Sequence, residues 1–297
     1  MTAAQFGNIS PNPAAQYNGL LGGEPNLTPE KATTKTFGVV LQPRFIPRFS
    51  LTVDYYDIKV TNAIQRIGAD TIITTCLNTA NPTLCGLIKR NPVGSLWLTN
   101  DGFVRDLQRN IGGVSTKGID VNAAYSHDIG AIGDVSLSFV GTYLDELITD
   151  TGVSKPYDCS GLYGTQCGVP APKWRHKARI GFNSPEGFGL SFQWRYAGPV
   201  SVDYTSSNPS LNGPFLAFGS KLPSQSYFDL ASTIRIDKRF TFRIGMNNML
   251  DREPPLVTSG IGGAQSACGA VTCNGNTYPA VYDALGRYVY AGISLDL

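Results

Sequence analysis

The sequence predicts an all-β fold built from about nine long antiparallel strands, and three observations support this class. Apolar and polar residues alternate with a period of two in segments that recur along the whole chain. Glycine, proline, tyrosine and phenylalanine are abundant, at 33, 19, 14 and 14 of 297 residues, which is typical of strands joined by turns. The connections between the alternating segments are short and long in turn.

The strands are predicted where the alternation is regular. Phe188, Leu190 and Phe192, for example, alternate with glycine, serine and glutamine. The predicted strands lie at residues 36–41, 49–56, 119–126, 135–143, 173–182, 188–196, 227–236, 241–247 and 288–297. Their lengths approach the roughly nine to eleven residues with which a tilted strand crosses a bilayer.

The connections separate a membrane barrel from a soluble β-sandwich or barrel, which would also alternate. Short turns on one side and long loops on the other are typical of outer-membrane barrels, whose long loops lie outside the cell. We therefore predict an antiparallel up-and-down transmembrane β-barrel architecture. The short connections lie at 43–48, 128–134, 184–187 and 237–239, and the long, extracellular ones at about 61–102, 149–172, 204–222 and 250–284.

Aromatic residues gather at both ends of the predicted strands, as the two interfacial girdles of a membrane barrel do. The long-loop ends carry Tyr55, Tyr143, Trp174, Trp194, Tyr196 and Phe228. The short-turn ends carry Phe49, Tyr125, Phe182, Phe188 and Phe242. This distribution is independent support for strands that cross a membrane.

The six cysteines form three close pairs, and each pair lies in a long connection. Local disulfides in an oxidising compartment account for this spacing. A metal site is the alternative, but zinc ligands usually come as C-x-x-C pairs, and the chain has only two histidines. The N-terminus lacks a secretory signal, so we expect further sequence before Met1. The predicted disulfides are Cys76 with Cys85, Cys159 with Cys167, and Cys268 with Cys273. Beside the first pair, four apolar residues are predicted to pack as short helices: Ile72, Ile73, Leu87 and Ile88.

Composition and motifs exclude several functions. A net charge of +2 and 15% charged residues argue against a nucleic-acid-binding surface. The sequence lacks an H-E-x-x-H motif, a G-x-S-x-G elbow and a P-loop. We therefore expect no enzymatic activity, no cofactor and no metal site.

Charged residues on the polar side of the strands are candidates for ligand contacts within a barrel lumen, although hydrogen bonding within a polar interior is the alternative. These candidates are Asp54, Asp120, Arg195, Asp229, Arg235 and Arg243. The basic stretch "KWRHKAR" at 173–179 has two interpretations. It attracts an anionic ligand or lipopolysaccharide phosphate, or it is simply one polar face of a strand. His176 falls on the apolar side, where an interfacial ring is expected.

Several segments, taken in series, resemble the C-terminal half of TonB-dependent outer-membrane receptors. They are "NLTPEKATTKTFGVVLQP" (26–43), "LTVDYYDIKVTNAI" (51–64), "RNIGGVSTKGIDVNAAY" (109–125), "YFDLASTIRI" (227–236), "GMNNMLDREPP" (245–255) and "YDALGRYVYAGISLDL" (282–297). The resemblance implies the last nine strands of a 22-strand barrel in the bacterial outer membrane, with residues 1–32 as the remnant of an extracellular loop. The plug domain and the first 13 or so strands would be absent, leaving an open curved sheet with edges at its first and ninth strands.

The resemblance also implies a function and partners. An intact receptor imports a scarce nutrient, such as a siderophore, vitamin or oligosaccharide, and is driven by the TonB energy-coupling complex through a TonB box near its N-terminus. A non-energised porin-like or adhesive barrel and a soluble secreted β-domain are the alternatives. The expected partners are the missing plug and strands, TonB, the barrel-assembly machinery, outer-membrane lipid and an unidentified small molecule. This incomplete barrel is expected to be inactive alone.

The last strand is expected to close the intact barrel and to carry its assembly signal. Its apolar phase continues to Leu297, which stands where the family usually has phenylalanine. The predicted closure and assembly residues are Tyr288, Tyr290, Ile293, Leu295 and Leu297.

Overall fold

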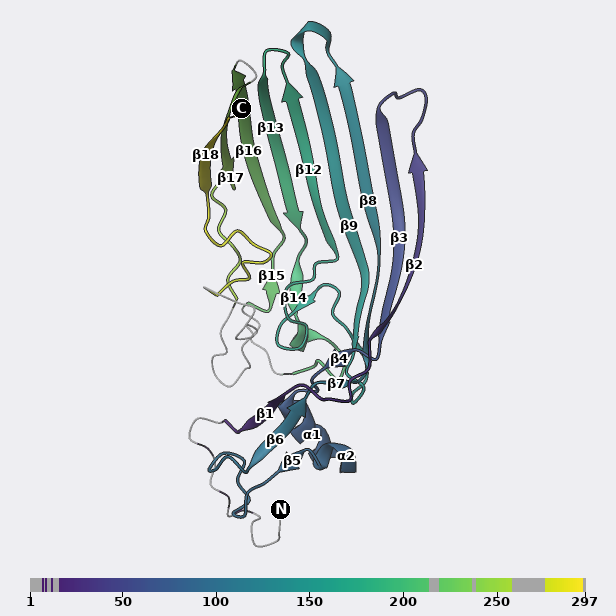
Figure 1. The fold of residues 1–297 in the computed structure, drawn as a ribbon, viewed down its shortest axis with the longest axis vertical. Coiled ribbons are helices and arrows are strands. Elements are labelled where there is room, and N and C mark those ends of the chain that lie inside the picture. Colours follow the sequence, from purple (N-terminus) through teal and green to yellow (C-terminus); the bar gives the residue numbers. More distant parts are fainter. Residues whose placement is uncertain are drawn as a thin grey trace. The chain divides into compact units, whose positions relative to one another are not determined.

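One antiparallel sheet dominates the computed structural model of the protein, which describes residues 7, 9, 12, 16–213, 219–236, 239–257 and 276–295. Nine strands follow one another across this sheet in the order in which they occur in the chain (Figure 1). They are β2 (Lys31–Leu41), β3 (Phe49–Thr61), β8 (Gly113–Asp128), β9 (Asp134–Asp150), β12 (Trp174–Asn183), β13 (Phe188–Ala197), β16 (Gln225–Ile236), β17 (Phe240–Asn247) and β18 (Tyr288–Leu295). The all-β class and the nine strands predicted from the alternation are confirmed.

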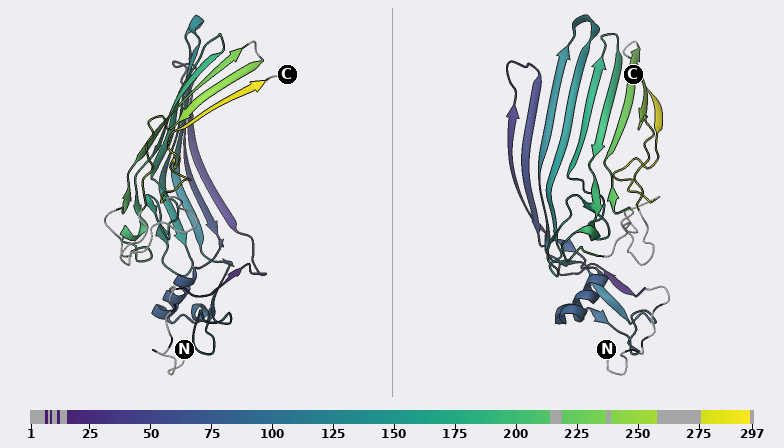
Figure 2. Two further views of the ribbon diagram at one scale, coloured as in Figure 1. Left: turned by 90° about the vertical axis from the view of Figure 1, so that its left-hand side faces the viewer. Right: turned by 180° about the vertical axis from the view of Figure 1, so that it is seen from behind.

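The sheet is open, as expected. Its edge strands are β2 and β18, each of which pairs on one side only within the described residues. In the right-hand view of Figure 2, purple β2 and yellow β18 lie at opposite edges. One short strand, β10 (Tyr157–Asp158), pairs with β9 outside this path.

Tight connections join the strands at one end of the sheet. Residues 42–48 join β2 to β3, and residues 184–187 join β12 to β13. The turn from β8 to β9 contains the 3-10 helix η1 (Gly130–Ile132). These turns fall where the sequence predicts short connections.

The strand faces differ in chemistry, because the register keeps like residues in rows. Ile180 pairs with Leu137 on one side and with Phe192 on the other. These three apolar side chains are 46%, 43% and 38% exposed, so no described residue covers this row. Among the described residues, Tyr227 is the only buried apolar residue of the nine long strands. The sheet therefore has an uncovered apolar face, whereas the buried cores belong to the connections.

One compact unit contains residues 1–33, 59–114 and 149–156. Its buried core consists of Ile67, Ile72, Leu84, Leu87, Leu96 and Val104. Its elements are β1 (Gly19–Gly22), β4 (Ile64–Gln65), α1 (Ala69–Thr79), α2 (Pro82–Cys85), β5 (Ile88–Lys89), β6 (Phe103–Leu107) and β7 (Arg109–Asn110). Within it β1 runs parallel to β6, and β5 antiparallel to β6.

The helices of this unit correct part of the sequence prediction. Ile72 and Ile73 lie in α1 as expected, but Leu87 and Ile88 lie beyond the end of α2. Ile88 pairs with Val104 in a strand ladder, and the carbonyl of Leu87 accepts the N–H of Arg105 at 2.8 Å. Hydrogen bonds to β6 thus draw these residues out of a helix. In the described part of the chain, no helix is long and apolar enough to cross a membrane.

The second unit contains residues 34–58, 115–148 and 157–297. Besides most of the sheet, it holds β11 (Leu162–Tyr163), β14 (Val200–Val202), η2 (Asp203–Thr205) and β15 (Lys221–Leu222). These short elements form a small sheet of their own in the order β11-β14-β15. They position the candidate site.

Candidate ligand-binding site

A cavity of about 550 Å³ lies in the second unit, over the ends of β9, β12, β13 and β16 that lead into long connections. Arg175, Lys177 and Arg195 supply its positive charge. Two loop segments complete its wall, at Pro170 with Pro172 and at residues 279–283. Strands therefore contribute the cations, and loops contribute most of the apolar wall.

The strand register explains why these cations meet. Lys177 pairs directly with Arg195 across β12 and β13, and Arg195 pairs with Tyr227 across β13 and β16. Directly paired residues point to the same face of a sheet. The alternation that the sequence shows in "KWRHKAR" therefore places Arg175 and Lys177 on the face of Arg195.

Arg195 is held by two carboxylates. Its Nε and Nη2 donate to Asp229 at 2.7 and 2.8 Å, while Nη1 and Nη2 donate to Asp283 at 2.8 and 2.5 Å. The guanidinium also lies over the ring of Tyr227, with 5.1 Å from Cζ to the ring centroid. Charge-assisted, forked hydrogen bonds of this kind fix orientation strongly.

Asp229 extends the network to the turn after β17. Its carboxylate accepts the backbone N–H of Asn248 at 2.9 Å and the side chain of Gln193 at 3.1 Å. Asn248 is fully buried with a positive φ of 51°, and its side-chain amide bonds both backbone groups of Arg252 at 2.9 Å. The "NNMLDREPP" stretch thus owes part of its pattern to an asparagine that adopts the left-handed region and closes this turn.

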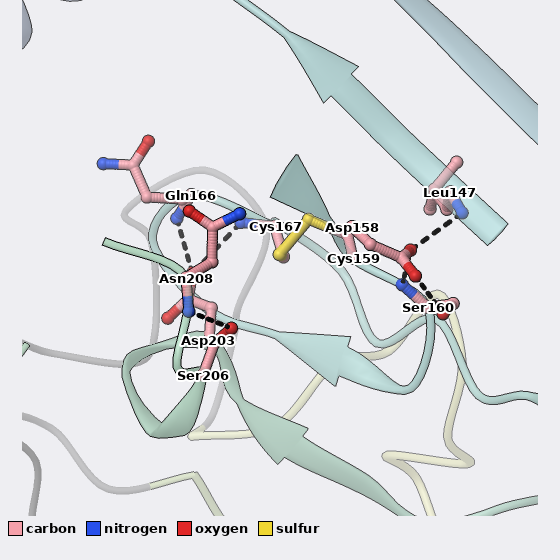
Figure 3. Close-up of a disulfide and its surroundings, with 9 residues drawn as sticks. All are labelled: Leu147, Asp158, Cys159, Ser160, Gln166, Cys167, Asp203, Ser206 and Asn208. Atoms are coloured by element: carbon pink, nitrogen blue, oxygen red, sulfur yellow. Dashed lines mark hydrogen bonds between the residues drawn. A yellow bond between two sulfur atoms is a disulfide. The ribbon is translucent and has the colours of Figure 1, made fainter. Parts of the chain in front are cut away.

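A second group of contacts fixes the loop around Cys159 and Cys167, which form a disulfide (Figure 3). Asp203 Oδ2 accepts the backbone N–H groups of Gln166 and Cys167 at 2.7 and 3.1 Å. Its Oδ1 is buried and has no hydrogen-bond partner among the described residues. Burial raises the pKa of Asp203, because desolvation opposes the carboxylate charge more than these donors favour it.

The close packing at Asp203 requires glycine at 164. A Cβ on Gly164, which has φ +138°, would fall 2.3 Å from Asp203 Oδ1. Gly164 and Gly168 exchange backbone hydrogen bonds at 3.0 and 2.8 Å, which turns the chain back under the carboxylate. The segment from Cys159 to Cys167, which leads to Pro170, is therefore held by its disulfide and by the hydrogen bonds of Gln166 and Cys167 to Asp203.

Buried tyrosines hold the other loop wall. Tyr163 and Tyr278 pack edge to face with 5.9 Å between ring centroids, and Tyr163 Oη donates to the carbonyl of Gly219 at 2.9 Å. Burial raises the pKa of Tyr278 to about 12, so its hydroxyl stays protonated. Tyr163, Tyr278 and Tyr282 belong to one buried apolar cluster, together with Val200 of β14 and Leu222 of β15.

An aromatic cluster lies on the other face of β12 and β13. His176 packs against Trp194 and Tyr196, with ring centroids 4.4 and 5.1 Å away, and its Nδ1 accepts from Trp174 Nε1 at 2.9 Å. His176 thus lies among aromatic rings, and its role as an interfacial ring stays a prediction.

The structure brings together only two of the six predicted lumen residues, Arg195 and Asp229. Asp120 accepts a hydrogen bond from Thr142 Oγ1 at 2.7 Å, which is the structural role weighed as the alternative. The other three lie elsewhere on the strands: Asp54 lies against Gly38, Arg235 pairs with Thr241, and Arg243 pairs with Thr233 and Gly292.

Sequence reasoning missed Asp283, which lies within the quoted "YDALGRYVYAGISLDL" but outside any alternating segment. Only the fold of residues 276–287 brings it to Arg195. The clearest available signal was its position just before the last strand, in the loop that must return to the barrel wall.

The remaining predictions concern the cysteines and the last strand. The first two pairs form disulfides, Cys76–Cys85 and Cys159–Cys167, while Cys268 and Cys273 lie outside the described residues. Tyr288, Tyr290, Ile293 and Leu295 lie in β18, which pairs with no described strand other than β17. Leu297 lies outside the described residues, and the closure and assembly role of these residues stays a prediction.

A family model described as TonB dependent receptor-like, beta-barrel matches residues 2–249. No curated protein matches the chain. Among solved structures, the FrpB iron transporter from Neisseria meningitidis (F3-3 variant) matches 93% of this chain and 33% of that one, with TM-score 0.54 and 10% identity. A mutant ferric enterobactin receptor from Pseudomonas aeruginosa, in complex with enterobactin, matches 94% of this chain and 34% of that one, with TM-score 0.58 and 13% identity.

At these identities the structural matches show a shared fold, and the chain spans about a third of the length of both solved structures. The family model, in contrast, covers most of the sequence. Together with the open antiparallel sheet, it shows that the chain belongs to the TonB-dependent receptor β-barrel family.

Proposed function

We propose that this chain supplies the C-terminal strands of an outer-membrane receptor that imports a scarce nutrient with energy from the TonB complex. The observation that carries the proposal is the sheet itself. It has one apolar face that no described residue covers, and its two edge strands pair on one side only within the described part of the chain. Within a membrane, unpaired edges of this kind must be joined to further strands.

The edge strands β2 and β18 indicate the first partners that we expect for this chain. Strands of the same receptor would pair with β2 and β18 and so close the barrel, with the last strand of this chain as the closing element. A plug domain would then fill the lumen, and TonB would act on it from the periplasm. Outer-membrane lipid would cover the apolar face, and the barrel-assembly machinery would insert the protein. Alone, this chain would not transport.

The long connections would lie outside the cell and collect the ligand. Two of them are stiffened by disulfides, and the cavity with Arg175, Lys177 and Arg195 lies where strands meet these connections. Ligands of this scaffold class include ferric siderophores, vitamins and oligosaccharides. None requires covalent chemistry from the protein, in keeping with the absence of catalytic motifs in the sequence.

Uptake by cells that produce the full gene product tests this proposal. Labelled ferric siderophores, cobalamin and oligosaccharides are supplied to paired strains with and without functional TonB. One of them is expected to enter only when TonB is active. Equal entry in both strains would show a porin-like barrel, and a gene product that stays in the aqueous fraction would show a soluble β-domain. Binding to cells without entry would show an adhesin.

A further inference from the structure

The guanidinium of Arg195 has two edges that each donate two hydrogen bonds, and a different carboxylate accepts from each edge. The edge formed by Nε and Nη2 binds Asp229, which lies on the neighbouring strand β16. The edge formed by Nη1 and Nη2 binds Asp283, which lies in the loop before β18. Each edge matches a planar group with two oxygens.

The two carboxylates differ in how firmly they are held. Asp229 is 12% exposed and accepts additional hydrogen bonds from Asn248 and Gln193, so it is a fixed part of the barrel wall. Asp283 is 24% exposed and lines the cavity. No described side chain other than Arg195 bonds its carboxylate.

The described lining of the cavity carries more positive than negative charge. Arg175, Lys177 and Arg195 line it, and Asp283 is the one carboxylate among the described lining residues. Two further carboxylates lie beside it: Asp229 on Arg195, and Asp120 on Thr142, which pairs with Arg175. Neither Arg175 nor Lys177 forms a salt bridge with any described residue. Lys177 also sits directly opposite Arg195 in the strand ladder, so the two cations lie on the same face of the sheet at this part of the cavity.

From this geometry we propose that Asp283 occupies the anion subsite of the cavity, and that a soluble ligand carrying a carboxylate-like group and further negative charge displaces it. The incoming group takes the outer fork of Arg195, and its remaining charge lies against Arg175 and Lys177. This inference rests on the proposed function, because it names the substrate class of the same receptor.

Displacement also releases part of the loop wall. The other hydrogen bonds of Asp283 are made by its backbone. Its N–H donates to Tyr227 Oη at 3.3 Å, and its carbonyl accepts the N–H of Gly286 at 3.3 Å. The carboxylate of Asp283 therefore acts as an internal competitor, and the ligand's affinity is reduced by the fraction of molecules in which the subsite is occupied.

Binding of citrate to the purified gene product in detergent, measured by calorimetry, tests the inference. Asp283→Asn keeps the shape of the side chain but removes the competing charge, so it is expected to tighten citrate binding by roughly tenfold, as for removal of a competing occupant. Asp283→Glu is expected to restore weak binding. Lys177→Gln is expected to weaken it several-fold. Asp251→Asn is the matched control, because Asp251 lies in the same connection and pairs with exposed Arg287 outside the cavity.

Three further arms make the result decisive. Inorganic phosphate in place of citrate separates a carboxylate preference from a general anion preference. A site for anions in general would bind phosphate and citrate more tightly by the same factor in Asp283→Asn. Thermal unfolding of each variant shows whether the loss of an ion pair has unfolded the site. Unchanged citrate binding in a folded Asp283→Asn protein, or no citrate binding in any variant, would overturn the inference.

The two proposals fail separately. TonB-dependent uptake of a neutral nutrient, without citrate binding, would leave the receptor function standing and remove the anion subsite. Absence of uptake for every nutrient, with citrate still bound more tightly by Asp283→Asn, would remove the receptor function and leave the anion subsite standing.

Discussion

Asp203 Oδ2 accepts the backbone N–H of Gln166 at 2.7 Å, across 37 positions of sequence (Figure 3). The contact joins η2, at the end of β14, to the hairpin closed by the Cys159–Cys167 disulfide. Two connections far apart in the chain are thereby fixed to each other beside the candidate site. The carboxylate that does so is fully buried.

This burial makes the stability of the loop depend on pH. Because desolvation raises the folded-state pKa of Asp203 above the ordinary value of 3.8, its stabilising contribution is complete below about pH 3.8. That contribution is lost as the pH rises through the folded-state pKa. The titratable side chains facing it are Tyr157, Tyr163, Tyr204 and Tyr278.

We therefore expect the unfolding temperature of wild type, relative to Asp203→Asn, to fall as the pH rises from about 4. The amide oxygen of asparagine still accepts the two backbone N–H groups but carries no charge. Near-ultraviolet circular dichroism follows the transition. Asp158→Asn is the control, because Asp158 is exposed and bonds the backbone of Leu147 and Ser160 in the same hairpin. A pH-independent difference between wild type and Asp203→Asn would contradict the expectation.

Removal of the neighbouring disulfide should destabilise the same hairpin. Cys159 and Cys167 are separated by 8 residues, and closing a loop of this size restricts the unfolded chain by about 2–3 kcal/mol. The double substitution to serine is expected to lower the free energy of unfolding by that amount in a urea titration. Reductant should reproduce the loss in wild type and have no effect at this site in the variant. The Cys76–Cys85 pair, in the other compact unit, is the comparison.

Adjacent residues of β16 test which face of the sheet meets lipid. Leu230 lies on the apolar face and Ala231 on the polar one, at the same depth in the strand. Leu230→Lys is expected to cost about 2–4 kcal/mol when the gene product folds into lipid vesicles, and Ala231→Lys much less. Equal costs in this titration would contradict the assigned orientation.

Two glycines near the last strand form another matched pair. A Cβ on Gly245 would fall 2.3 Å from the ring of Tyr290, whereas one on Gly292 would meet no atom within 4 Å. Gly245→Ala must push the Tyr290 ring aside, at a cost of roughly 0.5–1.5 kcal/mol in side-chain strain. Gly292→Ala is expected to be neutral in the same unfolding titration. A neutral Gly245→Ala would show that Tyr290 does not cover this glycine.

Period-two alternation is sufficient to predict the sheet, because successive side chains of a strand point to opposite faces, of which one is apolar here and the other polar. It placed Lys177 and Arg195 on one face without any knowledge of their neighbours. The same signal failed in the connections, where Leu87 and Ile88 were assigned to helices. There, pairing with β6 decides the local conformation, and that pairing is set by residues far away in sequence.

The sequence by itself determined the strands, their order, the short turns, the aromatic bands and the spacing of the cysteine pairs, since all of these depend on local periodicity and short-range spacing. Only the tertiary structure decided that Asp283 meets Arg195, 88 positions earlier, and that Asp203 holds the Cys159–Cys167 hairpin. The physical reason is that long connections have no repeating pattern. Their side chains find partners through packing of the folded chain, which no local signal encodes.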